Sequence, residues 1–167
     1  MNHRLSLTIA AAAFTATAGV PAFADDVITT HRLSAGLASE AVIEAVASCG
    51  RQGYNETVVL VDADGVRQAV LRGDHAGSHT LDSANDKAYT AATFKADTSA
   101  LVERTKTAPG FAALFTQLPH LLLFGGGIVI KMGDEVIGAI GAAGAPGGNL
   151  DEACARAGLD KIRDHLK

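Results

Sequence analysis

The chain has 167 residues, of which 48% are hydrophobic and 19% are charged. This length suits one compact domain and argues against an enzyme with separate cofactor and substrate domains. The formal net charge is −4, no basic block stands out, and aromatic residues make up only 5% of the chain, so nucleic acid is not an expected partner. Two cysteines are too few for a disulfide scaffold or a four-thiolate zinc site.

The beginning of the chain has the pattern of a secretory signal peptide. A short positive start precedes an uncharged run from Leu5 to Val20, and residues 22–24 (Ala-Phe-Ala) have the small-x-small form that signal peptidase accepts. The run is short and rich in Ala and Thr, which argues against a membrane span. We therefore predict that residues 1–24 are removed and that residues 25–167 form a single secreted or periplasmic domain that does not span the membrane.

The two cysteines, Cys49 and Cys154, would then face an oxidising compartment. One disulfide between them is an open alternative. Buried free thiols explain both residues equally well, because each lies at or near an apolar helical face.

The first half of this domain predicts one helix followed by a hairpin. Apolar residues from Leu33 to Ser48 gather on one stripe, as is typical of an amphipathic helix. The β-branched run from Thr57 to Val61 is too continuous for a half-exposed strand and predicts a central one. Turn residues at 62–65 lead into the second arm of the hairpin, from Val66 to Leu71.

Helices are predicted next. Thr80 can cap a helix from Leu81 to Phe94, and Asp97 can cap a shorter helix from Thr98 to Lys106. One or two further helical turns are expected over residues 111–117.

A second hairpin and a final helix complete the chain. Three glycines at 125–127 lead into a strand, and the chain returns over residues 135–140. After a loop of Gly, Ala and Pro, Asn149 can cap the last helix, with Glu152 completing a capping box. The stripe of this helix expected to be buried consists of Leu150, Ala153, Cys154, Ala157, Ile162 and Leu166.

The element order is therefore α–ββ–αα–ββ–α, with another strand expected around residues 121–124. Two hairpins cannot build an all-parallel sheet. An α+β fold, in which helices flank a mainly antiparallel sheet, is the economical arrangement.

Several motifs resemble those of one known family. They are residues 71–74 (Leu-Arg-Gly-Asp), 86–91 (Asp-Lys-Ala-Tyr-Thr-Ala), 125–127 (Gly-Gly-Gly), 138–141 (Gly-Ala-Ile-Gly) and 144–152 (Gly-Ala-Pro-Gly-Gly-Asn-Leu-Asp-Glu). Their order and spacing, from about residue 33 to 165, resemble the haem-degrading-domain family, which includes secreted haem-binding proteins of streptomycetes and proteins of bacterial glycolate operons. The resemblance is closest to the secreted branch. It implies a five-stranded antiparallel sheet flanked by helices, a homo-oligomer of up to eight subunits, and haem as the cofactor.

The resemblance also implies candidate iron ligands. In the secreted branch, a threonine before a serine at the start of the short helix approaches the iron, and Thr98 occupies this position. A hydroxyl at a helix start also bonds to backbone N–H groups, which is the structural alternative for Thr98. His75 replaces a small residue of the family pattern and is the second candidate, because imidazole is a common haem ligand.

Four other side chains are candidates for the cofactor site. His79 shares a loop with His75, and either histidine could reach a ligand on the following helix or simply be solvated. Lys87 and Arg72 could bond to haem propionates or form ordinary surface ion pairs. Tyr89 could belong to the core or to a pocket wall. No set of residues for nucleophilic or acid–base catalysis can be identified in the sequence.

The function these observations favour is an exported haem-binding protein that scavenges, buffers or senses haem or iron. One alternative is a haem-dependent enzyme that degrades haem or acts as a weak peroxidase. The other is an interaction module whose oligomer contacts a membrane sensor kinase.

Overall fold

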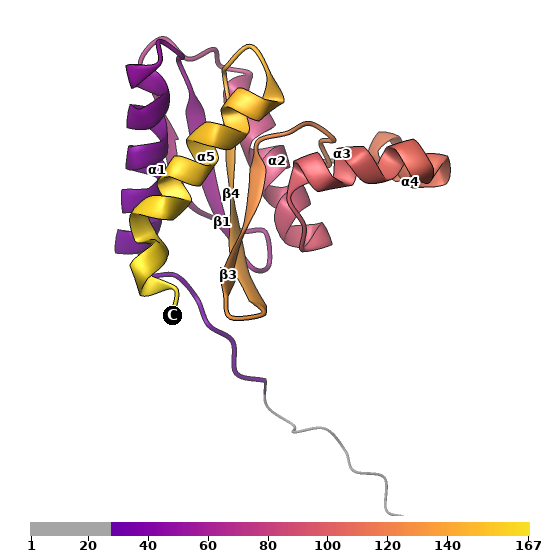
Figure 1. Cartoon of the computed structure of the whole chain (residues 1–167), viewed down its shortest axis with the longest axis horizontal. Coiled ribbons are helices and arrows are strands. Elements are labelled where there is room, and N and C mark those ends of the chain that lie inside the picture. The colour runs from indigo at the N-terminus through magenta and orange to yellow at the C-terminus, as the bar shows by residue number, and fades with distance from the viewer. Residues whose placement is uncertain (1–27) are drawn as a thin grey trace, which may run out of the picture.

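The computed structural model describes residues 28–167, and the predicted signal peptide lies outside these residues. The elements, labelled in Figure 1, are α1 (Ala35–Arg51), β1 (Thr57–Asp62), β2 (Arg67–Arg72), α2 (Thr80–Phe94), α3 (Thr98–Thr107), α4 (Pro109–Gln117), β3 (Gly127–Met132), β4 (Glu135–Ala143), α5 (Gly148–Ile162) and a 3₁₀ turn (Arg163–His165). This order confirms the predicted α+β fold. None of the helices in this part of the chain is both long and apolar enough to cross a membrane.

The two hairpins join into one antiparallel sheet with the strand order β2-β1-β4-β3. The expected count of five strands is wrong, because the sheet within residues 28–167 has four. Residues 121–124, where the sequence suggests a further strand, form no strand. The backbone N–H of Leu122 instead donates to the hydroxyl of Thr90 on α2 at 2.9 Å, so this segment is anchored to a helix rather than to a strand ladder.

Strand β1 is buried on both faces, as its continuous β-branched run predicts. Val58 and Leu60 belong to the larger core beneath α1 and α5. Val59 and Val61 belong to a second core, formed with the alanines of α2. The sheet therefore lies between α1 and α5 on one face and α2 on the other (Figure 1).

Helix α2 lies very close to the sheet because the facing side chains are small. Its buried positions include Ala84, Ala88, Ala91 and Ala92. A Cβ atom on Gly141 of β4 would lie 2.2 Å from the carbonyl oxygen of Ala84. Only a glycine at this position permits the observed distance between α2 and the sheet.

Helices α1 and α5 pack against each other and are joined by a disulfide between Cys49 and Cys154, whose Cα atoms are 5.5 Å apart. Of the two alternatives for the cysteines, the free thiols are therefore wrong. Close packing also requires Gly158, where a Cβ atom would lie 2.4 Å from the carbonyl oxygen of Ala41.

The predicted start and buried stripe of the last helix need correction. The N-cap is Gly147 and makes no side-chain cap bond, and Glu152 bonds to Arg156 rather than completing a capping box. The residues buried on α5 are Asp151, Cys154, Ala155, Gly158 and Ile162. Cys154 and Ile162 of the predicted stripe are confirmed. The rest of the face differs because contact with α1 selects small residues, and because one polar residue, Asp151, is paired inside.

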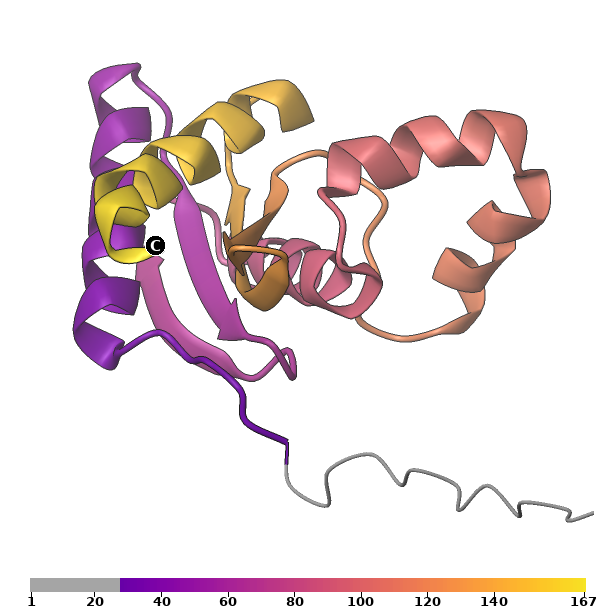
Figure 2. The ribbon, with the colours of Figure 1, turned by 60° about the horizontal axis from the view of Figure 1, so that its bottom comes forward.

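Helices α3 and α4 form an arm that extends away from the sheet in both views (Figures 1 and 2). Three aromatic rings stabilise its base, since Phe94, Phe111 and Phe115 have ring centroids 5.1–5.6 Å apart. Leu114 and Leu118 on the arm remain 44% and 51% exposed. The arm thus presents apolar surface that the subunit itself does not cover.

We predict that Gly158→Ala destabilises the protein by roughly 1–3 kcal/mol, because the new methyl group overpacks the contact between α1 and α5. The control is Gly50→Ala on α1, because no atom lies within 4 Å of the added Cβ atom. This substitution should be neutral or slightly stabilising. Urea unfolding measures both. Equal effects of the two substitutions would contradict the close packing described here.

Candidate functional site

A buried ion pair lies where α2, α5 and the loop after β4 meet. The Lys87 ammonium on α2 donates to the Asp151 carboxylate on α5 at 2.5 Å, and both side chains are 3% exposed. Lys87 also donates to the carbonyl oxygen of Ala142 at 2.9 Å, and Asp151 accepts from the backbone N–H of Ala145 at 2.9 Å. The pair therefore holds two helices, the end of β4 and its following loop in one arrangement.

A second buried carboxyl group, that of Glu56, lies beside this pair. Glu56 is 1% exposed, and burial, followed by the neighbouring Asp151 carboxylate, raises its pKa from 4.5 to about 8. The Lys87 ammonium acts in the opposite direction. One cation cannot balance two buried carboxylates, so Glu56 is the member that is neutral at pH 7.

Two glycines allow the chain before β3 to lie directly against this cluster. A Cβ atom on Gly126, whose φ is +120°, would lie 2.8 Å from the Asp151 Cβ atom and 3.0 Å from the Lys87 ammonium nitrogen. A Cβ atom on Gly127 would lie 2.3 Å from the Lys87 carbonyl oxygen. Gly126 and Gly127 are thus required for this segment to pack closely on Lys87.

The side chain of Phe124, 49% exposed, forms a wall shared by two neighbouring grooves. One groove, of about 260 Å³, includes Val102 and Leu123 in its lining. The other, of about 240 Å³, includes Leu122 and Lys87. The Lys87 nitrogen lies 5.0 Å from the centroid of the Phe124 ring, within the range of a cation–π contact. We call these two grooves the Phe124 cleft.

Of the six predicted site residues, His79 and Lys87 line the Phe124 cleft. Thr98 lies behind the cleft and is fully buried; its hydroxyl accepts a hydrogen bond from the Gly127 N–H at 2.9 Å. The structural alternative for Thr98 predicts that its hydroxyl bonds to a backbone N–H group. The observed N–H belongs to β3 and not to the first turn of α3. Thr98 therefore positions the glycine segment over Lys87.

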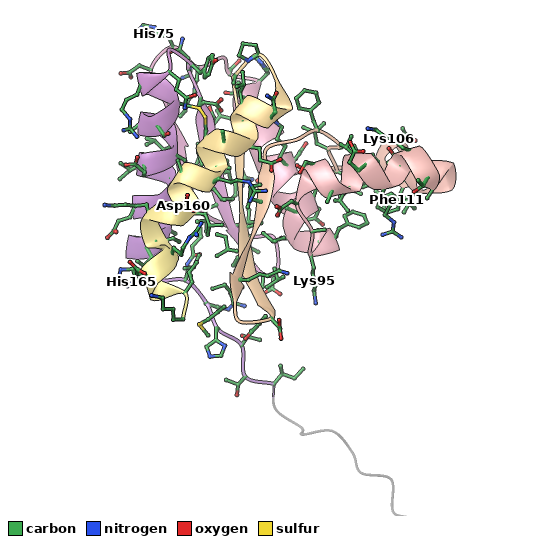
Figure 3. All side chains as sticks on the ribbon, viewed as in Figure 1. His75, Lys95, Lys106, Phe111, Asp160 and His165 are labelled. Atoms are coloured by element: carbon green, nitrogen blue, oxygen red, sulfur yellow. A yellow bond between two sulfur atoms is a disulfide. The ribbon has the colours of Figure 1, made fainter. Side chains whose placement is uncertain are left out.

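The other three predicted residues do not line the cleft. Arg72 donates two hydrogen bonds to the carbonyl oxygen of Ala76. His75 is exposed and has a φ of +63°, and Figure 3 shows it on the opposite side of the molecule from Phe111 on the arm. Tyr89 borders a separate groove of about 290 Å³, where its ring lies against Gly65.

Three residues of the site were not singled out by the sequence reasoning: Glu56, Phe124 and Asp151. Asp151 belongs to the conspicuous segment 144–152, in which the sequence pattern indicates Asn149 and Glu152 but gives no signal for a buried ion pair. Glu56 directly precedes the fully buried β1, which was the available signal for a buried acid. Phe124 precedes the glycine triplet, and nothing in the local pattern distinguishes a cleft wall from a strand residue.

Comparison with known proteins adds to this geometry. The profile of the family described as haem degrading protein HbpS-like matches residues 33–160. The chain belongs to this HbpS-like family. No protein of curated function matches the chain significantly.

Solved structures show the same fold. A double mutant of HbpS from Streptomyces reticuli is 36% identical with a TM-score of 0.75, over 87% of this HbpS-like chain and 97% of that one. PduOC, solved as a complex with haem, is 25% identical with a TM-score of 0.73, over 79% and 96% of the two chains. The protein ORFY of Klebsiella pneumoniae is 20% identical with a TM-score of 0.79, over 85% and 98%, and shares the fold alone.

We predict that Glu56→Gln removes a pH dependence of stability. The folded pKa of Glu56, about 8, lies above its unfolded value, so the folded state holds the extra proton between pH 4.5 and 8. Wild-type stability from this group is complete below pH 4.5 and is lost as the pH rises through 8, at up to about 1.4 kcal/mol per pH unit. Urea unfolding at several pH values should show this fall in the wild type and in the exposed control Glu40→Gln, but not in Glu56→Gln. Parallel curves for all three proteins would contradict the assignment.

We predict that Lys87→Met destabilises the fold by roughly 3–5 kcal/mol, because Asp151 would keep a buried charge without its partner. The matched control is Lys106→Met, since Lys106 is 65% exposed in its ion pair with Glu103 and should change stability by about 0–1 kcal/mol. Thermal or urea unfolding distinguishes the two variants. A similar small loss in both would mean that the buried pair does not organise the site.

Proposed function

We propose that this chain is an exported haem-binding protein and that the Phe124 cleft receives the porphyrin. The observation that carries the proposal is the half-exposed Phe124 ring, which stands between two grooves with the buried Lys87 at its base. An aromatic side chain exposed to this extent offers a flat apolar surface for a flat apolar ligand. Membership of the HbpS-like family and the haem complex of PduOC support this choice of ligand.

The polar groups of the cleft fit the two chemical needs of haem. The Lys87 ammonium has three N–H donors, and Asp151 and Ala142 use two of them, which leaves one for a ligand carboxylate such as a propionate. His79 borders the same groove, and we assign it as the iron donor from this subunit. Bound haem would supply an iron centre for ligand exchange and electron transfer.

This assignment changes the roles proposed for the other candidates. The Thr98 hydroxyl already accepts a bond from Gly127, so we propose that it positions the cleft rather than ligating iron. His75 remains the rival iron ligand. Arg72 is bonded to Ala76 and, like Tyr89, is proposed to act outside the porphyrin site.

We propose that a second copy of the chain closes the cleft. Each groove is below the roughly 300–1,000 Å³ of typical small-molecule pockets, so one subunit buries a porphyrin only partly. The apolar arm, with Leu114 and Leu118 exposed, is the surface on which we expect copies to meet. A homo-oligomer of up to eight subunits is the assembly that the family resemblance predicts.

Export is supported by two independent features. Residues 1–24 have the pattern of a signal peptide, and the Cys49–Cys154 disulfide suits a secreted or periplasmic protein. In that location the protein would scavenge, buffer or sense haem or iron. A membrane sensor kinase is the further partner we propose for a sensing role, and retention of a labelled kinase ectodomain by the haem-free oligomer would support it.

A haem titration of the mature, tag-free protein tests the proposal. We predict a Soret band that shifts and saturates at a fixed ratio of haem to chain. His79→Ala should weaken haem binding by roughly tenfold or more, whereas His75→Ala, in the same loop but away from the cleft, should leave the affinity unchanged.

Other outcomes of this titration have definite meanings. No saturable spectral change with excess haem would contradict haem binding itself. If His75→Ala lost the spectrum and His79→Ala kept it, the iron ligand would be His75, which replaces a small residue of the family pattern. A lost spectrum in Thr98→Val, in a protein that remains folded, would return that role to Thr98.

An enzyme that degrades haem is the second candidate, favoured by the description of the family as haem degrading. The lining of the cleft includes Glu103, Glu152 and His79 as acid–base groups, and bound haem would supply the iron for such chemistry. Peroxide added to the loaded protein distinguishes the two functions. Loss of the Soret band with release of iron supports degradation, and a stable spectrum supports binding alone.

A further inference from the structure

The disulfide lies in the interior of the molecule and joins two helices. Cys49 is in the last turns of α1 and Cys154 is in α5, and both are 0% exposed. Figure 3 shows the sulfur atoms in yellow between these two helices. Because each cysteine is carried by a helix, the two Cα atoms stay near their 5.5 Å separation when packing is retained.

A carboxyl group without a partner lies next to this disulfide. Both carboxyl oxygens of Glu56 are buried and have no hydrogen-bond partner within residues 28–167. One ligand oxygen of Glu56 and the sulfur atoms of Cys49 and Cys154 all lie within 4.8 Å of one another. As a neutral acid, Glu56 can face the Asp151 carboxylate, but as a carboxylate it has no donor among the described residues and needs a cation beside it.

The two sulfurs and the carboxyl oxygen together form a donor set for a thiophilic divalent cation. Zinc binds thiolates at about 2.3 Å and carboxylates at about 2.0–2.2 Å, which places tetrahedral ligand atoms roughly 3.5–3.8 Å apart. The Glu56 oxygen therefore needs to move by about 1 Å at most to join two separated sulfurs. The disulfide bond itself prevents binding, because bonded sulfurs are not thiolates.

A groove borders Glu56, and the two carboxyl oxygens and both cysteines are buried beneath its surface. It has a volume of about 260 Å³ and is lined by Glu56 together with Tyr54, Asn55, Gly73 and Asp74. A cation held by these three side chains takes a water molecule in its fourth coordination position. Three protein ligands and one water are the arrangement of an open zinc site rather than of a closed structural one.

We propose that Cys49, Cys154 and Glu56 form a redox-gated site for a zinc-class divalent cation. A dithiol or phosphine reductant donates two electrons to the disulfide, the S–S bond breaks, and two protons from water yield two thiols. The reductant is oxidised to a disulfide or a phosphine oxide. When the cation binds, both thiols and the Glu56 carboxyl group lose their protons to solvent, and the two thiolates and the Glu56 carboxylate coordinate the ion. The three proposed ligands do not line the Phe124 cleft, and the site needs no haem, although Glu56 also lies beside the Lys87–Asp151 pair.

Cobalt(II) alone, added to the haem-free full chain, tests this inference. The protein is reduced with a phosphine without oxygen, the reductant is removed, and free thiols are counted. We expect two thiols per chain, a native circular-dichroism spectrum, and a sulfur-to-cobalt charge-transfer band that saturates at one cobalt per chain. The oxidised protein should show no such band.

Variants identify the third ligand. Glu56→Gln should keep the charge-transfer band but weaken cobalt binding at least by the roughly 10- to 100-fold that loss of an outer-shell partner causes. The exposed Glu40→Gln on α1 is the matched control and should bind cobalt as the wild type does. Unchanged binding in Glu56→Gln would remove Glu56 from the site.

Three further results would overturn the proposal as a whole. They are a disulfide that resists the phosphine in the native protein, a reduced chain that unfolds, and a reduced, folded chain that gives no charge-transfer band. None of them bears on the haem titration, so failure of this site and failure of haem binding remain distinguishable.

Discussion

The buried ion pair between Lys87 and Asp151 is the interaction on which the candidate site depends. Two ions removed from water are stable only when their hydrogen bonds are satisfied, and the carbonyl of Ala142 and the N–H of Ala145 complete these bonds. Helix α2, helix α5, the end of β4 and the following loop therefore have one mutual arrangement. The glycine triplet and Phe124 take their positions over this arrangement, because any side chain at Gly126 would collide with the pair.

The same constraint explains why this part of the molecule suits a ligand. The glycine segment lies directly on Lys87, and Phe124, which precedes this segment, borders two open grooves. An aromatic ring consequently remains half exposed at the end of a tightly packed core. The arm of α3 and α4 extends beyond the sheet (Figure 2), and Leu114 and Leu118 on it remain exposed. A cleft and an uncovered arm in one subunit are together typical of a site completed by assembly.

Most of the fold could be predicted from the sequence because its signals are local. The β-branched run 57–61, the turn residues between hairpin arms and the alanine stripe of α2 each indicate one type of element. The fifth strand could not be excluded locally, because the contact between Leu122 and Thr90 joins positions 32 residues apart. The face of α5 was assigned to the apolar residues, whereas the fold buries Asp151 and Gly158 through partners that lie far away in the sequence.

The candidate site could be predicted only in part for the same reason. The motif at residues 86–91 indicated Lys87, the loop shared with His75 indicated His79, and both line the cleft. Thr98 was found as well, but the acceptor role of its hydroxyl toward Gly127 is set by tertiary packing. Neither the burial of Glu56 nor the exposure of Phe124 follows from residue type, since an acid is usually solvated and an aromatic ring is usually buried.

The most direct test of the account is the position of iron in a crystal of the haem-loaded protein, located by anomalous diffraction at the iron absorption edge. The account predicts one iron peak per chain beside Phe124, on the side of the cleft where His79 and Lys87 lie. A peak beside His75, on the surface outside the cleft, would contradict it.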